Sequence, residues 1–263
     1  MPILSKYAAF MRIGFKLDFY YMYSYVFSIL AYASYPLLML IVWGAIFGGK
    51  NVIIGGFGQT ALYAYFFVAY AGASLQSGVS ESIAEDVESG NITSEMLLPI
   101  SYAIRKFTDS TPSALANLAF IFLPIVIFTA IFANINISGI TLMAFALEIF
   151  LLYIISFLIE FIIGVSSIYF VSVGGISSIV TLLTFLSGGV LPNTFFPQQL
   201  QNILQLLPFN AYYYNPAATF TGTLSGSALA SALVIEITWA SALFLFAMIY
   251  WSVSRRKVVA VGG

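Results

Sequence analysis

Long apolar segments recur along the whole chain, and they constrain its fold more than any other feature. Several approach or exceed the roughly 20 residues that a helix needs to cross a lipid bilayer; the first begins near Val26 and the last ends near Trp251. Only 7% of the residues are charged and 61% are hydrophobic, whereas roughly a quarter of an ordinary soluble domain is charged. We therefore expect an all-α integral membrane protein, folded as a single membrane domain over residues 1–263.

Turn residues and polar breaks divide the apolar sequence into six expected transmembrane spans. Gly48 and Gly49 end the first span, since glycine pairs mark turns. Pro112 suits the first turn of the third span, whereas Pro124 should kink its middle. The spans are expected at about residues 26–47, 60–78, 112–133, 140–171, 176–191 and 228–251.

The segments outside the spans carry most of the polar residues. Residues 1–25 should contain a retained interfacial helix over about 3 to 19, because apolar and basic side chains fall on opposite faces of it. Residues 80–110 hold six of the ten acidic residues and must lie outside the hydrocarbon. Residues 192–227 carry four prolines between short apolar stretches, which predicts short helices that re-enter the outer leaflet. Residues 252–263 should form a basic tail.

Positive charge gathers on one side of this expected topology. Six spans place both termini and the 80–110 segment on the same side, together with eight of the nine Lys and Arg residues. Lys50 alone falls on the other side. Because Lys and Arg are enriched in cytoplasmic loops, we expect a multi-pass protein of the plasma membrane with both termini in the cytoplasm.

The composition argues against several functional classes. The chain has no Cys and no His, so disulfides, thiolate or imidazole metal sites and Ser-His triads lack their usual residues. A net charge of −1 provides no basic surface for nucleic acid. No GxxxxGK[ST] nucleotide-binding loop is present. We expect no catalytic residue, metal site or cofactor in this chain.

The 80–110 segment is the most informative polar region. Its first half should extend the second span as an acidic helix that Gly90 and Asn91 can stop in a left-handed cap. Residues 93–96 should then start a second short helix. Such a helix could transmit the motion of a soluble partner into the membrane. The other interpretation of this pattern is a solvated intracellular loop.

Two motifs resemble the permease subunits of type-2 ATP-binding-cassette (ABC) exporters. The acidic helix followed by a glycine and by LLPIS at residues 97–101 is similar to the signature between the second and third spans of that family. The sequence FLSGGVLP at residues 185–192, followed by FP at 196–197 and LLPF at 206–209, resembles its fifth span and re-entrant outer hairpin. The order of the parts also matches, so the resemblance covers essentially the whole chain.

The resemblance implies an ATP-driven exporter with two permease subunits, identical or paralogous, and two separate ATPase subunits that bind ATP and Mg²⁺. The residues that couple to the ATPase would be Glu81, Glu85, Asp86, Glu88, Gly90, Leu97, Leu98 and Pro99. The extracellular gate would comprise Pro192, Phe195, Phe196, Pro197, Pro208 and Phe209. The second and fifth spans would line the pathway, with Gln76, Glu160 and Ser187 as candidate pathway residues.

Three carboxylates fall inside expected spans, where no basic residue can pair with them: Glu148, Glu160 and Glu236. Each costs about 2.5 to 3.5 kcal/mol at the bilayer centre if it is charged. They could form a cation site or proton path, which gives the alternative function of a proton- or cation-coupled secondary transporter. They could instead be protonated and hydrogen-bonded across helices, or Glu148 and Glu236 could lie nearer the outer interface. The internal repeat typical of many secondary transporters is not evident, and an intramembrane enzyme would lack His, Cys and an intramembrane aspartate.

Overall fold

The computed structural model describes residues 22–50, 52–135, 137–170 and 172–261. Within these residues the regular structure is helical, and the strand-like pairing is limited to one bridge between Ile54 and Phe57. The expected all-α architecture is therefore confirmed. The interfacial helix expected near residues 3 to 19 lies outside the described residues.

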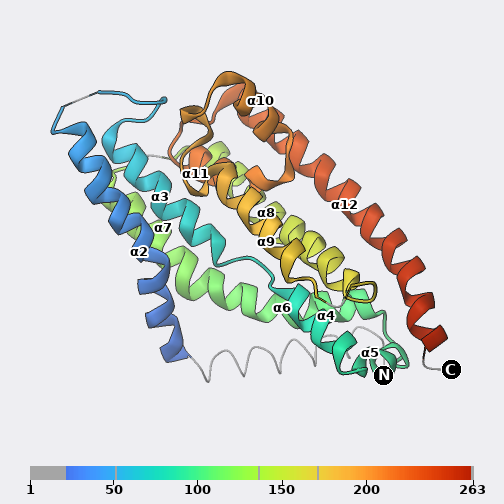
Figure 1. Ribbon diagram of the computed structural model, residues 1–263. Coiled ribbons are helices and arrows are strands. Elements are labelled where there is room, and N and C mark those ends of the chain that lie inside the picture. The colour runs from blue at the N-terminus through green and yellow to red at the C-terminus, as the bar shows by residue number, and fades with distance from the viewer. Residues whose placement is uncertain (1–21, 51, 136, 171, 262–263) are drawn as a thin grey trace.

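Four helical stretches of the described chain are long and apolar enough to cross a membrane. They correspond to the first, third, fourth and sixth expected spans, and Figure 1 shows the first and the last of them at the two flanks of the bundle. The stretches are α2 (Met22–Phe47), the continuous run of α6 (Tyr102–Asn117), η1 (Leu118–Phe122) and α7 (Leu123–Phe132), then α8 (Gly139–Ser166) and α12 (Gly226–Val261).

The second span is shorter than predicted, and the fifth has about its predicted length but starts and ends two residues earlier. The second is α3 (Gln59–Ala73), which has 15 residues, and the fifth is α9 (Gly174–Thr184) followed by the π-helical turn η2 (Phe185–Gly189). Each is shorter than the roughly 20 residues of a full crossing. Polar residues after Ala73 and the non-helical backbone at Ser187 and Gly188 account for the early ends.

The third span begins ten residues earlier than expected. The run from Tyr102 to Phe132 has 31 residues and is about 46 Å long at about 1.5 Å per residue, so its first turns extend beyond a hydrocarbon layer of about 30 Å. Pro112 consequently lies inside α6 and not in a first turn. A π-helical turn, η1, comes just before Pro124, which cannot donate the helical hydrogen bond to residue 120.

Three further boundaries differ from the sequence prediction. Residues 74–78 are not helical, and Gly78 has a φ of +59°, so the acidic helix α4 (Val79–Glu88) does not continue α3. The fourth helix, α8, ends at Ser166, not near residue 171. The last helix, α12, continues to Val261, so the basic residues 255–257 are helical and do not form an irregular tail.

Short helices follow the fifth span, as the proline pattern predicts. Pro197 precedes α10 and Pro208 begins η4, positions where the missing N–H and the fixed φ of proline are tolerated. Figure 1 shows these pieces at the end of the molecule that also contains the loop after α2. The pieces are η3 (Asn193–Phe195), α10 (Gln198–Leu206), η4 (Pro208–Ala211) and α11 (Tyr214–Phe220).

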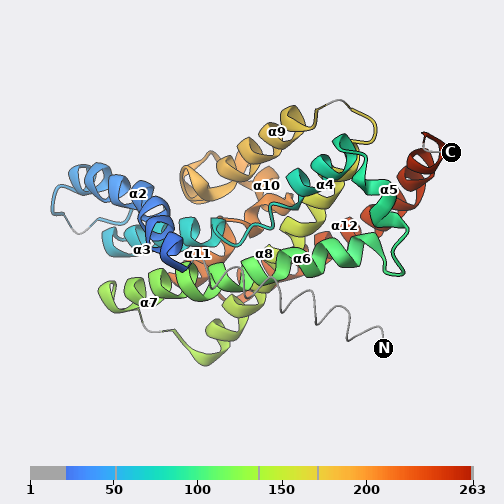
Figure 2. The same cartoon turned by 90° about the horizontal axis from the view of Figure 1, so that it is seen from below.

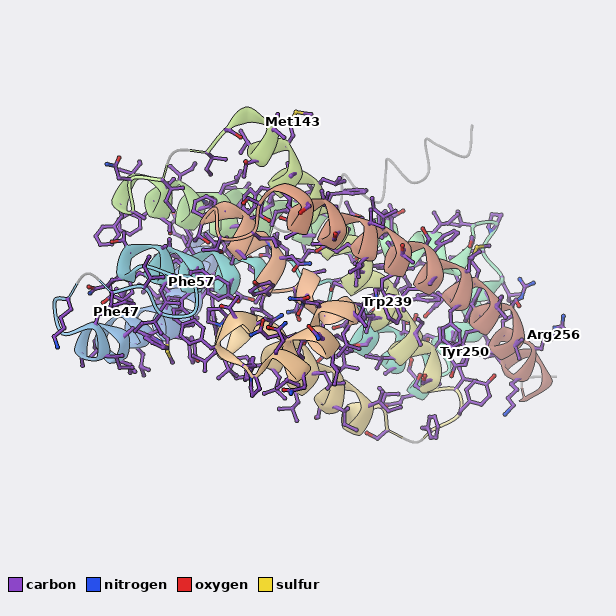
Figure 3. The ribbon with its side chains drawn as sticks, turned by 90° about the horizontal axis from the view of Figure 1, so that it is seen from above. Phe47, Phe57, Met143, Trp239, Tyr250 and Arg256 are labelled. Carbon is purple, nitrogen blue, oxygen red and sulfur yellow. The ribbon has the colours of Figure 1, made fainter. Side chains whose placement is uncertain are left out.

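The two ends of the molecule are chemically different. At one end, the C-terminal turns of α12 lie near α4 and α5 (Asn91–Met96), as Figures 1 and 2 both show. Figure 3 places Arg256 at this end and Phe47 and Phe57 at the opposite one. We call the end with Arg256 the basic end. We call the opposite end the hairpin end, after the short helices from η3 to α11, which we call the hairpin. Two hydrophobic clusters fill the bundle, the larger one around α3 and the smaller one around Ile83 and Phe161 near the basic end.

Candidate functional site

Helix α4 carries its exposed carboxylates along one face. Glu81, Glu85 and Glu88 are exposed and are spaced four and three residues apart, so they lie on the same side of the helix. The opposite side buries Val79 and Ile83 against α8. We call the three exposed glutamates the acidic stripe.

An apolar turn lies next to the acidic stripe. Gly90, with a φ of +75°, ends α4 and lets the chain reverse into α5, whose Ile92 is buried. Beyond α5 the chain exposes Leu97, of which 82% is accessible, together with Leu98 and Pro99. We call the acidic stripe and these three residues the docking face. This surface therefore combines exposed apolar and acidic side chains.

Asp86 lies outside the docking face although the sequence groups it with the other carboxylates. Its side chain points toward α6, where its Oδ2 lies 2.8 Å from Nζ of Lys106 and accepts a 2.7 Å hydrogen bond from the hydroxyl of Tyr102. Lys106 also donates to Oγ of Ser82 at 2.7 Å. Asp86 therefore holds α4 against α6.

A second ion-pair group fixes α5 to α6. Arg105 pairs with Glu95 of α5, and its Nε lies 3.5 Å from Oδ2 of Asp109 on the next turn of α6. The docking face thus rests on two sets of charged contacts.

Glu160 connects α4 to α8. Its Oε2 accepts hydrogen bonds from the backbone N–H and the hydroxyl of Ser80, in the first turn of α4. A carboxylate at this position offsets the unpaired amides and the positive end of the helix dipole. Four residues on, Gly164 lets the two helices approach closely, since a Cβ there would lie 2.7 Å from Cβ of Ile83. Glu160, a candidate pathway residue, therefore anchors α4 to α8.

The candidate pathway residues lie on three different elements, since Glu160 belongs to α8, Ser187 to η2 and Gln76 to the segment after α3. Helix α3 is largely buried, and Gln76 lies in the turn after it, where it interacts with Tyr213. Ser187 is buried in η2 with no hydrogen-bond partner for its hydroxyl among the described residues. Helix α9 differs from α3, because Thr184 is its single buried residue.

The turn at Ser187 and Gly188 packs the end of the fifth span against α3 and α11. Gly188 has a φ of +119°, and its carbonyl accepts a 2.8 Å hydrogen bond from the buried hydroxyl of Tyr65. A Cβ on Gly188 would lie 2.7 Å from Cβ of Tyr214. Gly188, the first glycine of the FLSGGVLP motif, is therefore required both by its backbone conformation and by the lack of space for a side chain.

The expected gate residue Phe195 is packed into an aromatic cluster. Its ring centroid lies 5.1 Å from that of Trp43 and 6.3 Å from that of Phe57. It also covers Gly55, where a Cβ would lie 2.8 Å from the ring. Phe195 thus fastens the hairpin to the loop after α2.

The remaining gate residues shape the hairpin. Two buried asparagines join its ends, since Asn193 donates to Asn210 at 2.8 Å. Phe196 and Phe209 are half-buried, and Phe209 packs against the main core. The prolines mark where its pieces begin: Pro192 precedes η3, Pro197 precedes α10 and Pro208 begins η4.

Two of the three intramembrane carboxylates meet the buried helix α11. Thr219 donates to Glu148 Oε1 at 2.9 Å, and Asn215 donates to Glu236 Oε1 at 2.7 Å. Asn215 and Thr219 are one turn apart, so one face of α11 binds α8 and α12 together. Both carboxylates are almost fully buried and leave Oε2 without a partner in the described structure.

Sequence reasoning missed Asn215 and Thr219. The sequence feature that could have indicated them is a pair of polar residues, four positions apart, within an apolar segment that is rich in aromatic residues. The tyrosine run and Pro216 obscured it by suggesting irregular backbone.

The comparison with protein families decides the identity of this fold. The family model described as ABC-2 family transporter protein matches residues 20–262. The chain belongs to this family. The ABC-2 permease is thus the membrane subunit of an ABC transporter and not its catalytic ATPase domain. A search of curated protein sequences gives no significant match.

Proposed function

We propose that this ABC-2 permease is the membrane subunit of an ATP-driven exporter, with its ATPase subunit bound to the docking face. The observation that carries the proposal is the acidic stripe of α4 together with exposed Leu97 and Leu98, which follow α5 at the basic end. In such a contact the charged residues give specificity. Leucines that become buried when the partner binds supply much of the affinity.

The contacts of α8 supply a route from the docking face to the hairpin end. Near the basic end, α8 holds α4 through Glu160 and the Gly164 approach. Near the hairpin end, it holds α11 through Glu148 and Thr219. Displacement of α4 by ATP-driven closure of the ATPase would therefore move α8 and alter the packing of the hairpin.

The proposal includes two permease subunits and two ATPase subunits. Helix α9 exposes Ile179 and Leu182 beside the hydroxyls of Ser178 and Thr181. This mixture suits a face that meets a second permease and borders a polar pathway better than one that meets lipid alone. The basic end would face the cytoplasm of a plasma-membrane protein, with α3 and α9 completing six passages of the chain.

A charge-reversal variant tests the docking face. We expect Glu81→Lys/Glu85→Lys/Glu88→Lys to insert and melt like the wild type, because exposed substitutions change stability by about 0.5 kcal/mol or less. Recovery of the ATPase with the purified permease, and the associated ATP hydrolysis, should fall about ten-fold or more, since like charges across an interface cost several kcal/mol. Mass spectrometry would identify the ATPase by its nucleotide-binding loop.

Two other charged positions provide the controls. Asp86→Lys should lower the melting temperature, because it places two cations together between α4 and α6. Lys50→Glu changes charge at the opposite end of the molecule and should leave ATPase recovery unchanged. Full recovery and full activity of the ATPase with the triple variant would contradict the proposed docking face.

A further inference from the structure

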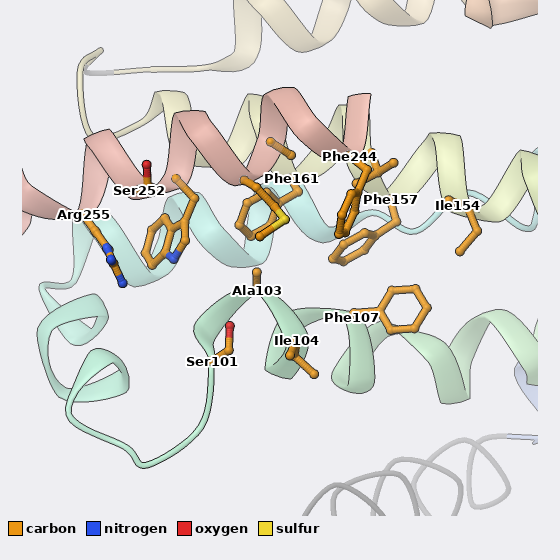
Figure 4. Close-up of a pocket in the computed structure, with 14 residues that line it drawn as sticks. Ser101, Ala103, Ile104, Phe107, Ile154, Phe157, Phe161, Phe244, Ser252 and Arg255 are labelled. Carbon is orange, nitrogen blue, oxygen red and sulfur yellow. The ribbon is translucent and has the colours of Figure 1, made fainter. Parts of the chain in front are cut away.

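An apolar groove with a cavity of about 540 Å³ opens between α6, α8 and α12 near the basic end. The buried rings of Phe157 and Phe161 on α8 lie at its base, with α6 and α12 as its walls (Figure 4). Its volume falls in the range of roughly 300 to 1,000 Å³ that is typical of small-molecule sites.

The polar atoms of the groove gather at one end. Arg255 and Ser252 lie at that end and Ile154 lies at the other, as Figure 4 shows. Arg255 is exposed and forms no ion pair within the described part of the chain. Trp251, which lines the groove one turn before Arg255, is of the residue type enriched at membrane–water interfaces. The groove is therefore amphiphilic, with a cationic head position and an apolar remainder.

The length and surroundings of the groove match one leaflet of a bilayer. From Phe244 to Arg255 the α12 wall rises about 16 Å, at about 1.5 Å per residue, which is close to half of a hydrocarbon layer of about 30 Å. The rim residues Phe244 and Met248 are each more than half exposed and lie on α12, which is apolar enough to span the membrane. The groove consequently opens toward lipid chains.

We propose that this groove binds an anionic phospholipid, with one acyl chain along Phe157 and Phe161 and the phosphate at Arg255. Basic pockets between transmembrane helices are known sites for anionic headgroups. The charge of Arg255 favours such a lipid over a zwitterionic one, whose headgroup has no net charge. The proposal does not depend on the ATPase contact, because the groove shares no residue with the docking face.

Quenching of Trp251 fluorescence tests the site directly. The chain has three tryptophans, so Trp43→Phe/Trp239→Phe leaves Trp251 as the single reporter, provided that this background keeps a wild-type melting profile. In nanodiscs, phosphatidylglycerol with brominated acyl chains should quench Trp251 at lower mole fraction than brominated phosphatidylcholine. Arg255→Ala should weaken this preference about five-fold, the equivalent of about 1 kcal/mol per basic residue near an anionic surface.

Two matched variants make the result specific. Arg256→Ala removes the same charge from a residue that does not line the groove and should keep the preference. Ala103→Phe adds bulk to the α6 wall and should reduce quenching by both lipids.

Four outcomes would overturn the proposal. These are equal quenching by the two lipids, an equal effect of both arginine variants, loss of the preference on addition of inorganic phosphate, and no quenching of Trp251 by either lipid.

Discussion

At the scale of single residues, Gly188 shows how one position determines the end of a membrane helix. Its positive φ turns the chain out of η2, and its missing side chain leaves room for Tyr214. The turn also presents the carbonyl that the buried Tyr65 hydroxyl requires. An alanine could satisfy neither the backbone angle nor the space.

We predict that Gly188→Ala destabilises the protein by about 2 kcal/mol or more, from backbone strain of about 1–3 kcal/mol and the added clash with Tyr214. Thermal unfolding in detergent would measure the change. Gly175→Ala is the matched control, because it lies in a helix and a Cβ there meets no atom within 4 Å. Similar melting temperatures for the two variants would show that the turn does not need a glycine.

At the scale of elements, α11 shows how a seven-residue helix can be held inside a membrane protein. All of its residues are buried, and a helix this short has little stability of its own. Its position depends on apolar packing and on two hydrogen bonds, one to Glu148 of α8 and one to Glu236 of α12. These carboxylates thus serve the fold of the hairpin.

We expect Glu148→Gln and Glu236→Gln to retain stability and ATP hydrolysis, because the amide oxygen still accepts from Thr219 or Asn215. Glu148→Leu should cost about 1–3 kcal/mol by leaving the buried Thr219 hydroxyl unpaired. Melting temperatures and ATPase rates of the reconstituted complex, with and without a proton gradient, would measure both effects. Loss of gradient-dependent activity in the glutamine variants would support proton coupling instead.

At the scale of the whole molecule, the directions of the four long helices require the chain to cross back twice. Figures 1 and 2 show that α2 and the run from α6 to α7 both lead toward the hairpin end, whereas α8 and α12 both lead back toward the basic end. The short helix α3 brings the chain back between α2 and α6, and the short helix α9 brings it back between α8 and α12. Their partial lengths suit passages that are shielded by neighbouring helices or by a second subunit.

Cysteine labelling tests this topology in a chain that has no cysteine of its own. Lys50→Cys and Gln198→Cys should react with a membrane-impermeant thiol reagent on intact cells. Glu88→Cys and Arg256→Cys should react only after permeabilisation. Labelling of position 88 or 256 on intact cells would contradict the proposed orientation.

The sequence by itself determined the all-α membrane class, the four long apolar helices and the short helices between Pro192 and Tyr214. These features depend on local quantities, namely the length of an apolar run and the backbone limits of proline and glycine. The left-handed turn at Gly90 was predictable for the same reason. The family motifs, read in order, likewise indicated the ABC-2 permease before any contact was known.

Only the tertiary structure decided which polar residues face outward and which hold the fold together. Asp86 and Glu88 are close in sequence and alike in charge, yet Asp86 pairs with Lys106 while Glu88 is exposed. Glu160 caps α4, and Glu148 meets Thr219, 71 residues away. A carboxylate's partner across such separations is set by how whole helices pack, and no local pattern records that packing.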